Sequence, residues 1–168
     1  MKSIAFFGHR AIYNDDIIRE RLKNTLKSVI SKGFSRLIVG SHGDFDKLAL
    51  SVCLNYKKSI DNEIQINVVL TNLSSLNRGK RGYSQADIVN DMGCEPIFYD
   101  VEEEHYKNRI TVCNKKMVDD SDLIICYVDM RKYVSGAKKA VNYALKQNKC
   151  VINLFMEEDI MRTIKNYK

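Results

Sequence analysis

Three residues that could hold an anionic ligand follow the first apolar run of the chain. Ser3–Phe7 ends abruptly in Gly8-His9-Arg10. A glycine lets a ligand approach the main chain, and the planar guanidinium of an arginine can hold a phosphate through two parallel hydrogen bonds. A structural interpretation competes, in which Gly8 forms a turn and the two polar side chains are solvated.

A second set of polar residues follows the next apolar run, in the sequence Gly40-Ser41-His42-Gly43-Asp44-Phe45-Asp46. The carboxylates of Asp44 and Asp46 could act as a base or bind ribose hydroxyls. They could equally complement the positive end of a helix dipole. His9 and His42 lack an accompanying carboxylate cluster, so the sequence predicts no metal site.

Ser135-Gly136-Ala137 opens a predicted helix late in the chain. The free N–H groups of a helix N-terminus form a ready anion site, and small residues let the backbone wrap a phosphate. The alternative is a serine N-cap followed by small residues that pack closely. Neither the P-loop nor the G-x-G-x-x-G fingerprint is present. Asp129 lies in a further polar turn, after a predicted buried strand.

Alternating strands and helices must position these turns. Strands are predicted over 3–7, 36–40, 64–70, 95–99, 122–128 and 150–155. The first helix is predicted to begin at a cap formed by Asn14 or Asp15 and to end at Gly33, and further helices are predicted over 44–58, 85–92, 103–119, 135–147 and 159–167. The alternation predicts a Rossmann-like, doubly wound, mostly parallel α/β sheet with helices on both faces, in a single domain over 1–168. Right-handed crossovers place the strand ends along one edge, so the polar turns should converge there.

Composition narrows the class of protein. The chain has 168 residues, a formal net charge of +6 and five cysteines without a C-x-x-C pair. Unclustered cysteines favour reduced thiols in a cytosol. No apolar run approaches the roughly 20 residues of a membrane span. Met1-Lys2 leads directly into a strand, which predicts no signal peptide. We therefore expect a cytoplasmic protein. The positive charge suits anionic ligands, and 77–83 is a concentrated basic loop.

The motifs, in their order, resemble those of the SLOG superfamily of Rossmann-like proteins, particularly its small bacterial and phage members. Gly8-His9-Arg10 resembles the "TGHR" motif, and 40–46 resembles the G-x-A-x-G-x-D turn. Arg109 to Asp122 is similar to the R-N-x-x-M-v-d-x-s-D segment, and Ser135-Gly136-Ala137 to the G-G-T turn. The resemblance extends over nearly the whole chain.

The resemblance implies a pocket for a nucleotide or a nucleotide-derived molecule. Members of the superfamily include the lonely-guy phosphoribohydrolases, DprA-type proteins that bind single-stranded DNA, and sensor domains. By this resemblance, Arg10 and 40–46 would line the pocket, 135–137 would hold phosphate, and Arg109 would contact the phosphate or brace the site. Because such relatives commonly pair, the resemblance also implies a homo-oligomer.

Departures from the family pattern favour binding over catalysis. The threonine of the G-G-x-G-T turn is replaced by Ala137, and the glutamate three residues later by Ala140. His42 stands where the family has alanine. We therefore expect a ligand-binding module. The alternatives are a nucleoside-phosphate glycosidase that uses His9, His42 or Asp44, and a single-strand nucleic-acid binder that uses 78–83. The expected ligand-binding residues are Gly8, His9, Arg10, Gly40, Ser41, His42, Gly43, Asp44, Asp46, Arg109, Asp129, Ser135, Gly136 and Ala137.

Overall fold

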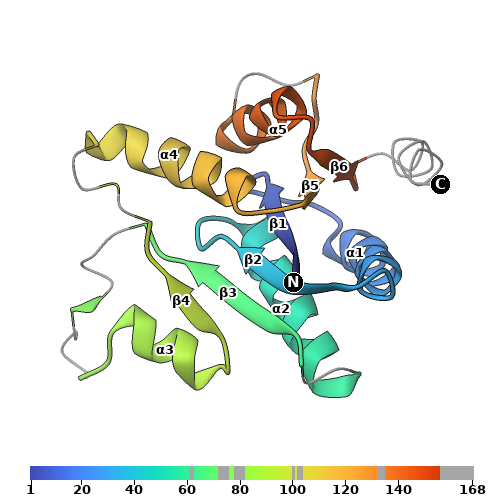
Figure 1. Cartoon of the computed structure of the whole chain (residues 1–168), viewed down its shortest axis with the longest axis horizontal. Helices are drawn as coiled ribbons and strands as arrows, with labels where there is room; N and C mark the ends of the chain where they lie inside the picture. Colours follow the sequence, from blue (N-terminus) through green and yellow to red (C-terminus); the bar gives the residue numbers. More distant parts are fainter. Residues whose placement is uncertain are drawn as a thin grey trace.

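Six parallel strands form one sheet in the order β4-β3-β2-β1-β5-β6 (Figure 1). The structure is a computed structural model that describes residues 1–60, 63–71, 76–77, 82–99, 101, 104–131 and 135–155. The strands are β1 (Lys2–Gly8), β2 (Phe34–Val39), β3 (Gln65–Val69), β4 (Glu95–Ile97), β5 (Leu123–Tyr127) and β6 (Cys150–Asn153). The helices are α1 (Asp15–Ile30), α2 (Asp44–Ser59), α3 (Gln85–Asp91), α4 (Tyr106–Asp119) and α5 (Gly136–Lys146). The predicted doubly wound α/β fold is confirmed.

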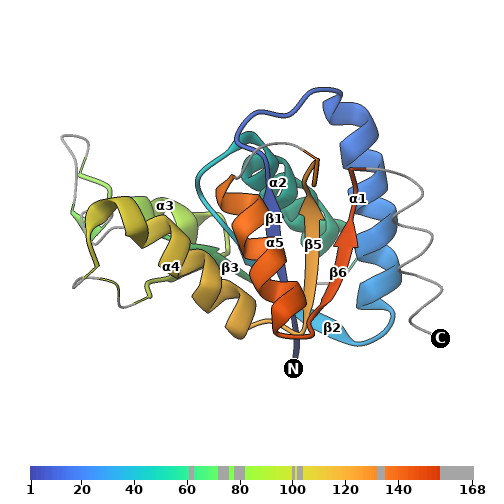
Figure 2. The ribbon, with the colours of Figure 1, turned by 90° about the horizontal axis from the view of Figure 1, so that it is seen from above.

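Helices cover both faces of the sheet, as Figures 1 and 2 show from two directions. Helices α1, α2 and α3 pack on one face, where Ile4 and Phe6 of β1 join their core cluster. Helices α4 and α5 pack on the other face, with Ala5 and Phe7 of the same strand. Because successive side chains of a strand point to opposite faces, a strand covered on both sides is a continuous apolar run. That is why the sequence pattern located β1 and β5 closely.

The course of the chain reverses direction beside β1. It first moves outward from β1 through β2 and β3 to β4, and then returns to place β5 on the free side of β1. In open α/β sheets, a reversal of this kind leaves a crevice outside the carboxyl ends of the strands, and ligands bind there. Gly8, the last residue of β1, is in register with Tyr127 of β5. The turn after β1 therefore lies next to the reversal.

Some residues predicted to face the core are exposed instead. The exposed fractions are 54% for Ile17, 36% for Ile110 and 52% for Leu145. Ile17 and Leu145 each adjoin a buried residue of the same helix, Ile18 and Ala144, which makes the contact with the core instead. Ile110 borders a cavity at the carboxyl edge of the sheet. The apolar run 150–155 predicts that Cys150 is a small core residue, but Cys150 is exposed because it begins an edge strand.

Element ends also differ from the sequence prediction. Helix α1 ends at Ile30, and Gly33 adopts a φ of +88° in the turn that follows. Helix α4 begins at Tyr106, later than predicted. Strand β4, which contains Pro96, lies at the edge of the sheet, as the proline predicts. The closing helix predicted over 159–167 lies outside the described residues.

The opposite, amino-terminal edge of the sheet is held by polar contacts. The carboxylate of Asp122 accepts hydrogen bonds from the backbone N–H of Ser3 at 2.8 Å and from its hydroxyl at 3.0 Å. These bonds, mainly the backbone one, hold the pKa of Asp122 below its usual range. Lys149 donates to the carbonyl of Ser121 at 2.7 Å. These contacts give Asp122 a structural role at this edge of the sheet.

Close packing, rather than backbone conformation, requires glycine at position 8. Among the described glycines, those with positive φ are Gly33, Gly82 and Gly93, so Gly8 is not left-handed. A Cβ built on Gly8 would overlap the ring of Phe45. Phe45 is fully buried and stacks on Tyr127 with ring centroids 6.1 Å apart. The Phe45 ring, in the first turn of α2, therefore packs directly against Gly8, where the turn after β1 begins.

We expect Gly8→Ala to lower the free energy of unfolding by about 2 kcal/mol or more, because the added methyl group must displace the packed Phe45 ring. Chemical denaturation monitored by circular dichroism measures the change. Gly136→Ala is the matched control, since a Cβ there meets only Asn114 Nδ2, at 3.8 Å. We expect it to change stability by less than about 0.5 kcal/mol. Equal stability of the two variants would contradict this account of Gly8.

Candidate functional site

A cavity of about 270 Å³ opens at the carboxyl edge of the sheet, between the ends of β1, β2 and β3 and the helices α4 and α5. The lining from the polar turns and from polar side chains of the neighbouring elements comprises Gly8, His9, Arg10, Gly40, Ser41, His42, Asp46, Thr71, Asn114, Ser135, Gly136 and Ala137. Most of the residues predicted for the site therefore lie around one hollow. The remaining lining is apolar and comes from β1, β3 and α4.

Four predicted site residues do not line this cavity. Gly43 and Asp44 join the two turns: the N–H of Asp44 donates to the carbonyl of Arg10 at 2.9 Å. The Asp44 side chain is exposed and pairs with Lys47 at 3.5 Å. Arg109 donates from Nε to the carbonyl of Glu104 at 3.2 Å. Asp129, the fourth, is buried behind the turn after β1.

The N-terminus of α5 opens into the cavity. The hydroxyl of Ser135 accepts a hydrogen bond from the N–H of Lys138 at 3.1 Å, and its carbonyl accepts from Lys139 at 2.9 Å. Ser135 is therefore a helix N-cap, as the structural interpretation predicted. The N–H groups of Gly136 and Ala137 donate to no residue in the described part of the chain. They are the donors that a ligand in the cavity could use.

Two polar side chains of the lining have no hydrogen-bond partner among the described residues. The guanidinium of Arg10 makes no hydrogen bond or ion pair with any described residue. The same is true of the amide of Asn114, which lies on α4 beside Gly136. Asn114 was not among the expected binding residues. A polar residue within the apolar stripe formed by Ile110, Cys113 and Met117 was the sequence pattern that could have identified it.

Short hydrogen bonds hold the turn after β2 in the cavity wall. The Nε2 atom of His42 lies 2.6 Å from the hydroxyl of Thr71, and the hydroxyl of Ser41 donates to the carbonyl of Val69 at 2.8 Å. Burial, assisted by the positive charge of Arg10, lowers the pKa of His42. His42 is therefore neutral near pH 7. Thr71 was a second residue missing from the expected set, although the turn after 64–70 was expected at this edge.

Asp46 supplies the carboxylate of the cavity. Its Oδ2 atom accepts a hydrogen bond from the backbone N–H of His42 at 2.9 Å. Burial raises its pKa to about 6, although that hydrogen bond opposes the shift. A Cβ on Gly40 would lie 2.7 Å from Oδ2. Glycine at position 40 therefore makes room for the carboxylate.

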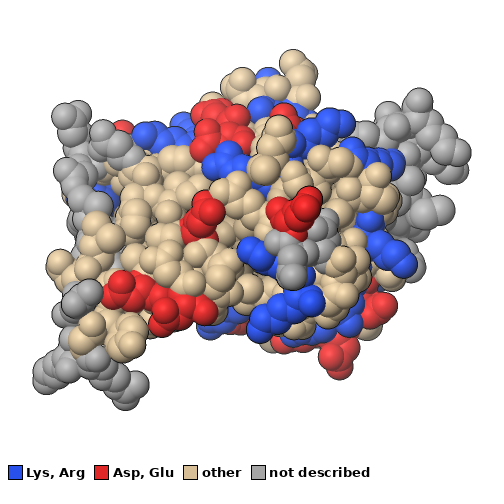
Figure 3. Space-filling view, turned by 60° about the horizontal axis from the view of Figure 1, so that its bottom comes forward, with Lys and Arg blue, Asp and Glu red and all other residues tan. Residues whose placement is uncertain are grey.

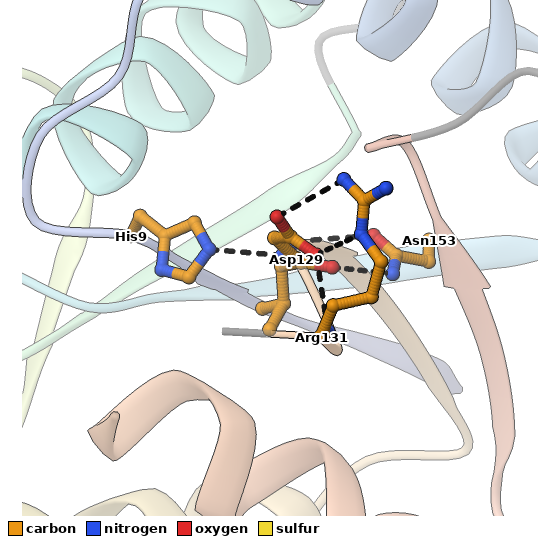
Figure 4. Close-up of polar contacts among 5 residues, drawn as sticks. His9, Asp129, Arg131 and Asn153 are labelled. Atoms are coloured by element: carbon orange, nitrogen blue, oxygen red, sulfur yellow. Dashed lines mark hydrogen bonds and ion pairs between the residues drawn. The ribbon is translucent and has the colours of Figure 1, made fainter. Parts of the chain in front are cut away.

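His9 braces the turn after β5 (Figure 4). Its Nε2 atom accepts a hydrogen bond from the N–H of Asp129 at 2.9 Å, so Nε2 carries no proton. The carboxylate of Asp129 accepts from the N–H and Nε of Arg131, both at 3.0 Å. The amide of Asn153 bonds both backbone groups of Val128. These contacts join the ends of β1, β5 and β6, and they support a bracing role for His9.

A second hollow, of about 330 Å³, lies on the other side of the turn after β2. It shares Gly40, Ser41, His42 and Asp46 with the first cavity. Its remaining lining is mainly apolar and comes from α2, α3 and β3, and includes Leu50, Leu70, Val89 and Met92. The segment from Gly40 to Asp46 therefore contributes to the lining of both the first cavity and the second hollow and separates them.

The comparisons with known proteins leave the family open. No family model matches the sequence, and no curated protein matches it. In the described ranges, no three His, Cys, Asp or Glu side chains gather as a metal site would require. None of the described helices is long and apolar enough to cross a membrane. The structure thus supports a Rossmann-like parallel α/β fold with a polar cavity at its carboxyl edge, and pairing with a second copy stays a prediction.

The raised pKa of Asp46 predicts a pH-dependent stability. An unfolded aspartate ionises near pH 3.9, whereas Asp46 in the folded chain ionises near 6. Folding is therefore progressively destabilised as the pH rises from about 4 through 6. We expect Asp46→Asn to raise the free energy of unfolding at pH 7.5 by about 1 kcal/mol, reduced for partial exposure. This increase in the free energy of unfolding should vanish below about pH 4, where Asp46 is protonated in both the folded and the unfolded chain.

Urea denaturation of both proteins across this pH range provides the test. Asp44→Asn removes an exposed carboxylate from the same helical turn and is the matched control. A stabilisation by Asp46→Asn that is the same at pH 4 and at pH 7.5 would contradict the assignment of the raised pKa to Asp46.

Proposed function

We propose that this protein binds a phosphate-containing, nucleotide-derived small molecule in the cavity at the carboxyl edge of its sheet. The observation that carries the proposal is the guanidinium of Arg10, which has no hydrogen-bond or ion-pair partner among the described residues and lies in the lining that also contains the start of α5. A cation that no described residue pairs and two helix N-terminal N–H groups together favour an anion. The amide of Asn114 lies beside Gly136, at the start of α5, and can add a further hydrogen bond.

The size and position of the cavity support a small ligand. Its volume of about 270 Å³ is near the lower end of the range for small-molecule sites, which is roughly 300 to 1,000 Å³. Its place beside the reversal between β1 and β5 is where open α/β sheets bind ligands. The order of motifs resembling the SLOG superfamily supports a nucleotide-type ligand. On this proposal the protein is a binding or sensing module.

The phosphate clamp can be tested by calorimetry with AMP, ADP and ADP-ribose. We expect at least one of these to bind, and we expect Arg10→Ala to weaken that binding by about 10- to 100-fold, because it removes a charge-assisted hydrogen bond. Arg19→Ala is the matched control. It removes the same charge from α1, where Arg19 donates to Ser51. Unchanged affinity in Arg10→Ala, or no binding by the wild-type protein of any of the three nucleotides, would contradict the proposal.

Asn114→Ala tests the side-chain amide of Asn114, which lies on α4 beside the start of α5. We expect it to weaken binding of the same nucleotide by about two- to tenfold, the effect of losing one neutral hydrogen bond. Asn55→Ala, at an exposed position of α2, should leave the affinity unchanged. Equal affinities in these two variants would remove Asn114 from the site.

Hydrolysis of the ligand is the second candidate function. It is favoured by one observation: neutral His42 and Asp46, with a pKa of about 6, lie together in the lining and could exchange a proton near neutral pH. The position where lonely-guy enzymes carry a glutamate is Ala140, which is buried in the core. Chromatography of AMP after incubation distinguishes the candidates, because a binding module returns the nucleotide intact and a glycosidase releases adenine.

Binding of single-stranded nucleic acid is less favoured. On the face drawn in Figure 3, Lys and Arg side chains are interspersed with Asp and Glu and do not form one continuous patch. Residues 78–81 of the basic loop lie outside the described residues, so the role of that loop stays a prediction.

A further inference from the structure

We propose that the carboxylate of Asp46 accepts hydrogen bonds from the vicinal hydroxyls of a ribose, so that the cavity selects ribonucleotides over 2′-deoxyribonucleotides. This inference rests on the proposed function and names the class of ligand for the same site. It also assigns to Asp46 a specificity-determining role distinct from the phosphate clamp at Arg10.

The cavity presents one cation and one carboxylate that are not paired with each other. Arg10 comes from the turn after β1, and Asp46 comes from the first turn of α2. No ion pair joins the two among the described residues. A ligand that satisfies both must carry an anionic group and, close to it, hydrogen-bond donors. A sugar phosphate has this composition.

One oxygen of the Asp46 carboxylate remains available to a ligand. Oδ2 is held by the backbone N–H of His42 at 2.9 Å, whereas Oδ1 accepts from no described residue. Every fully buried side-chain nitrogen or oxygen in the described residues has a partner, so Oδ1 is not fully buried, and Asp46 lines both hollows. The bond to His42 fixes the carboxylate, and a fixed acceptor costs little further ordering when a ligand binds.

The surroundings of Asp46 favour a neutral donor. Its carboxylate is partly removed from water, and the nearby polar groups are already engaged. His42 Nε2 is bonded to Thr71, and the hydroxyl of Ser41 donates to a backbone carbonyl. A sugar hydroxyl can replace the lost water without bringing a charge. A carboxylate is also the group that binds ribose hydroxyls in other doubly wound folds.

The spacing of the two turns favours the sugar over the base. The carbonyl of Arg10 accepts the N–H of Asp44 at 2.9 Å, and a Cβ on Gly43 would lie 3.1 Å from Arg10 Cα. The turn with the phosphate clamp therefore touches the turn with Asp46. In a nucleotide the ribose is joined to the 5′-phosphate through a single methylene group, so the ribose is the part that reaches a directly adjoining turn.

Calorimetry with paired probes tests the inference. The probes are AMP against 2′-deoxy-AMP, and ribose 5-phosphate against 2-deoxyribose 5-phosphate, all at pH 8, where phosphate and carboxylate are both ionised. We expect the wild-type protein to prefer the ribose form of each pair by about tenfold or more, the effect of one charge-assisted hydrogen bond. Asp46→Asn should reduce this preference to below about threefold, and Asp44→Asn should retain it.

Each outcome separates this inference from the proposed function. No binding of any of the four probes by the wild-type protein overturns the ribose inference, and it overturns the proposed function as well when ADP and ADP-ribose also fail to bind. Equal affinities for the ribose and deoxyribose forms overturn the ribose inference and leave the phosphate site intact. A preference that persists in Asp46→Asn assigns the discrimination to another residue and also overturns it. If Asp46→Asn fails to fold, the Asp46→Ala variant takes its place, and the wild-type preference still decides whether ribose is selected.

Discussion

The contact between Gly8 and the ring of Phe45 is the constraint on which the candidate site depends. The buried ring lies directly beneath the last residue of β1 and stacks on Tyr127 of β5. Because α2 begins at this ring, its first turn is held against the turn that follows β1. Arg10 and Asp46 therefore come to one cavity although they belong to different crossovers. A larger residue at position 8 would separate the two charged groups by moving α2.

The electrostatics of the cavity follow from the same arrangement. The turn after β1 and the first turn of α2 are joined by a backbone hydrogen bond between Arg10 and Asp44. The Arg10 guanidinium and one oxygen of Asp46 have no partners among the described residues. Burial raises the pKa of Asp46 and lowers that of His42. A partly buried charged group without a partner lowers the free energy of unfolding. Proteins commonly keep such groups at sites that bind ligands. The stable frame of His9, Asp129 and Asn153 beside the cavity keeps the turns in place.

Much of the fold could be predicted because its strands are covered on both faces. Continuous apolar runs such as Ile4–Phe7 and Leu123–Cys126 identify buried strands, and their alternation with helices identifies a parallel sheet. Helix faces were harder to predict. Ile110 belongs to an apolar stripe yet is exposed, because it borders the cavity, whose position depends on how α4 packs on the sheet. The roles of single residues were harder still to predict. Gly8 is required by close packing against Phe45, and Asp44 lies outside the cavity lining although Asp46 belongs to it.

The sequence by itself determined the order of the elements and the polar turns that end the central strands, because both depend on local pattern and on the rules of parallel crossovers. The tertiary structure decided which side chains of those turns share a cavity. Asn114 and Thr71 enter the lining from α4 and from the end of β3, while Arg109 and Asp129 do not. Which side chains line the cavity depends on how the helices pack on the sheet. That packing involves segments far apart in the sequence, so no local stretch of the chain predicts it.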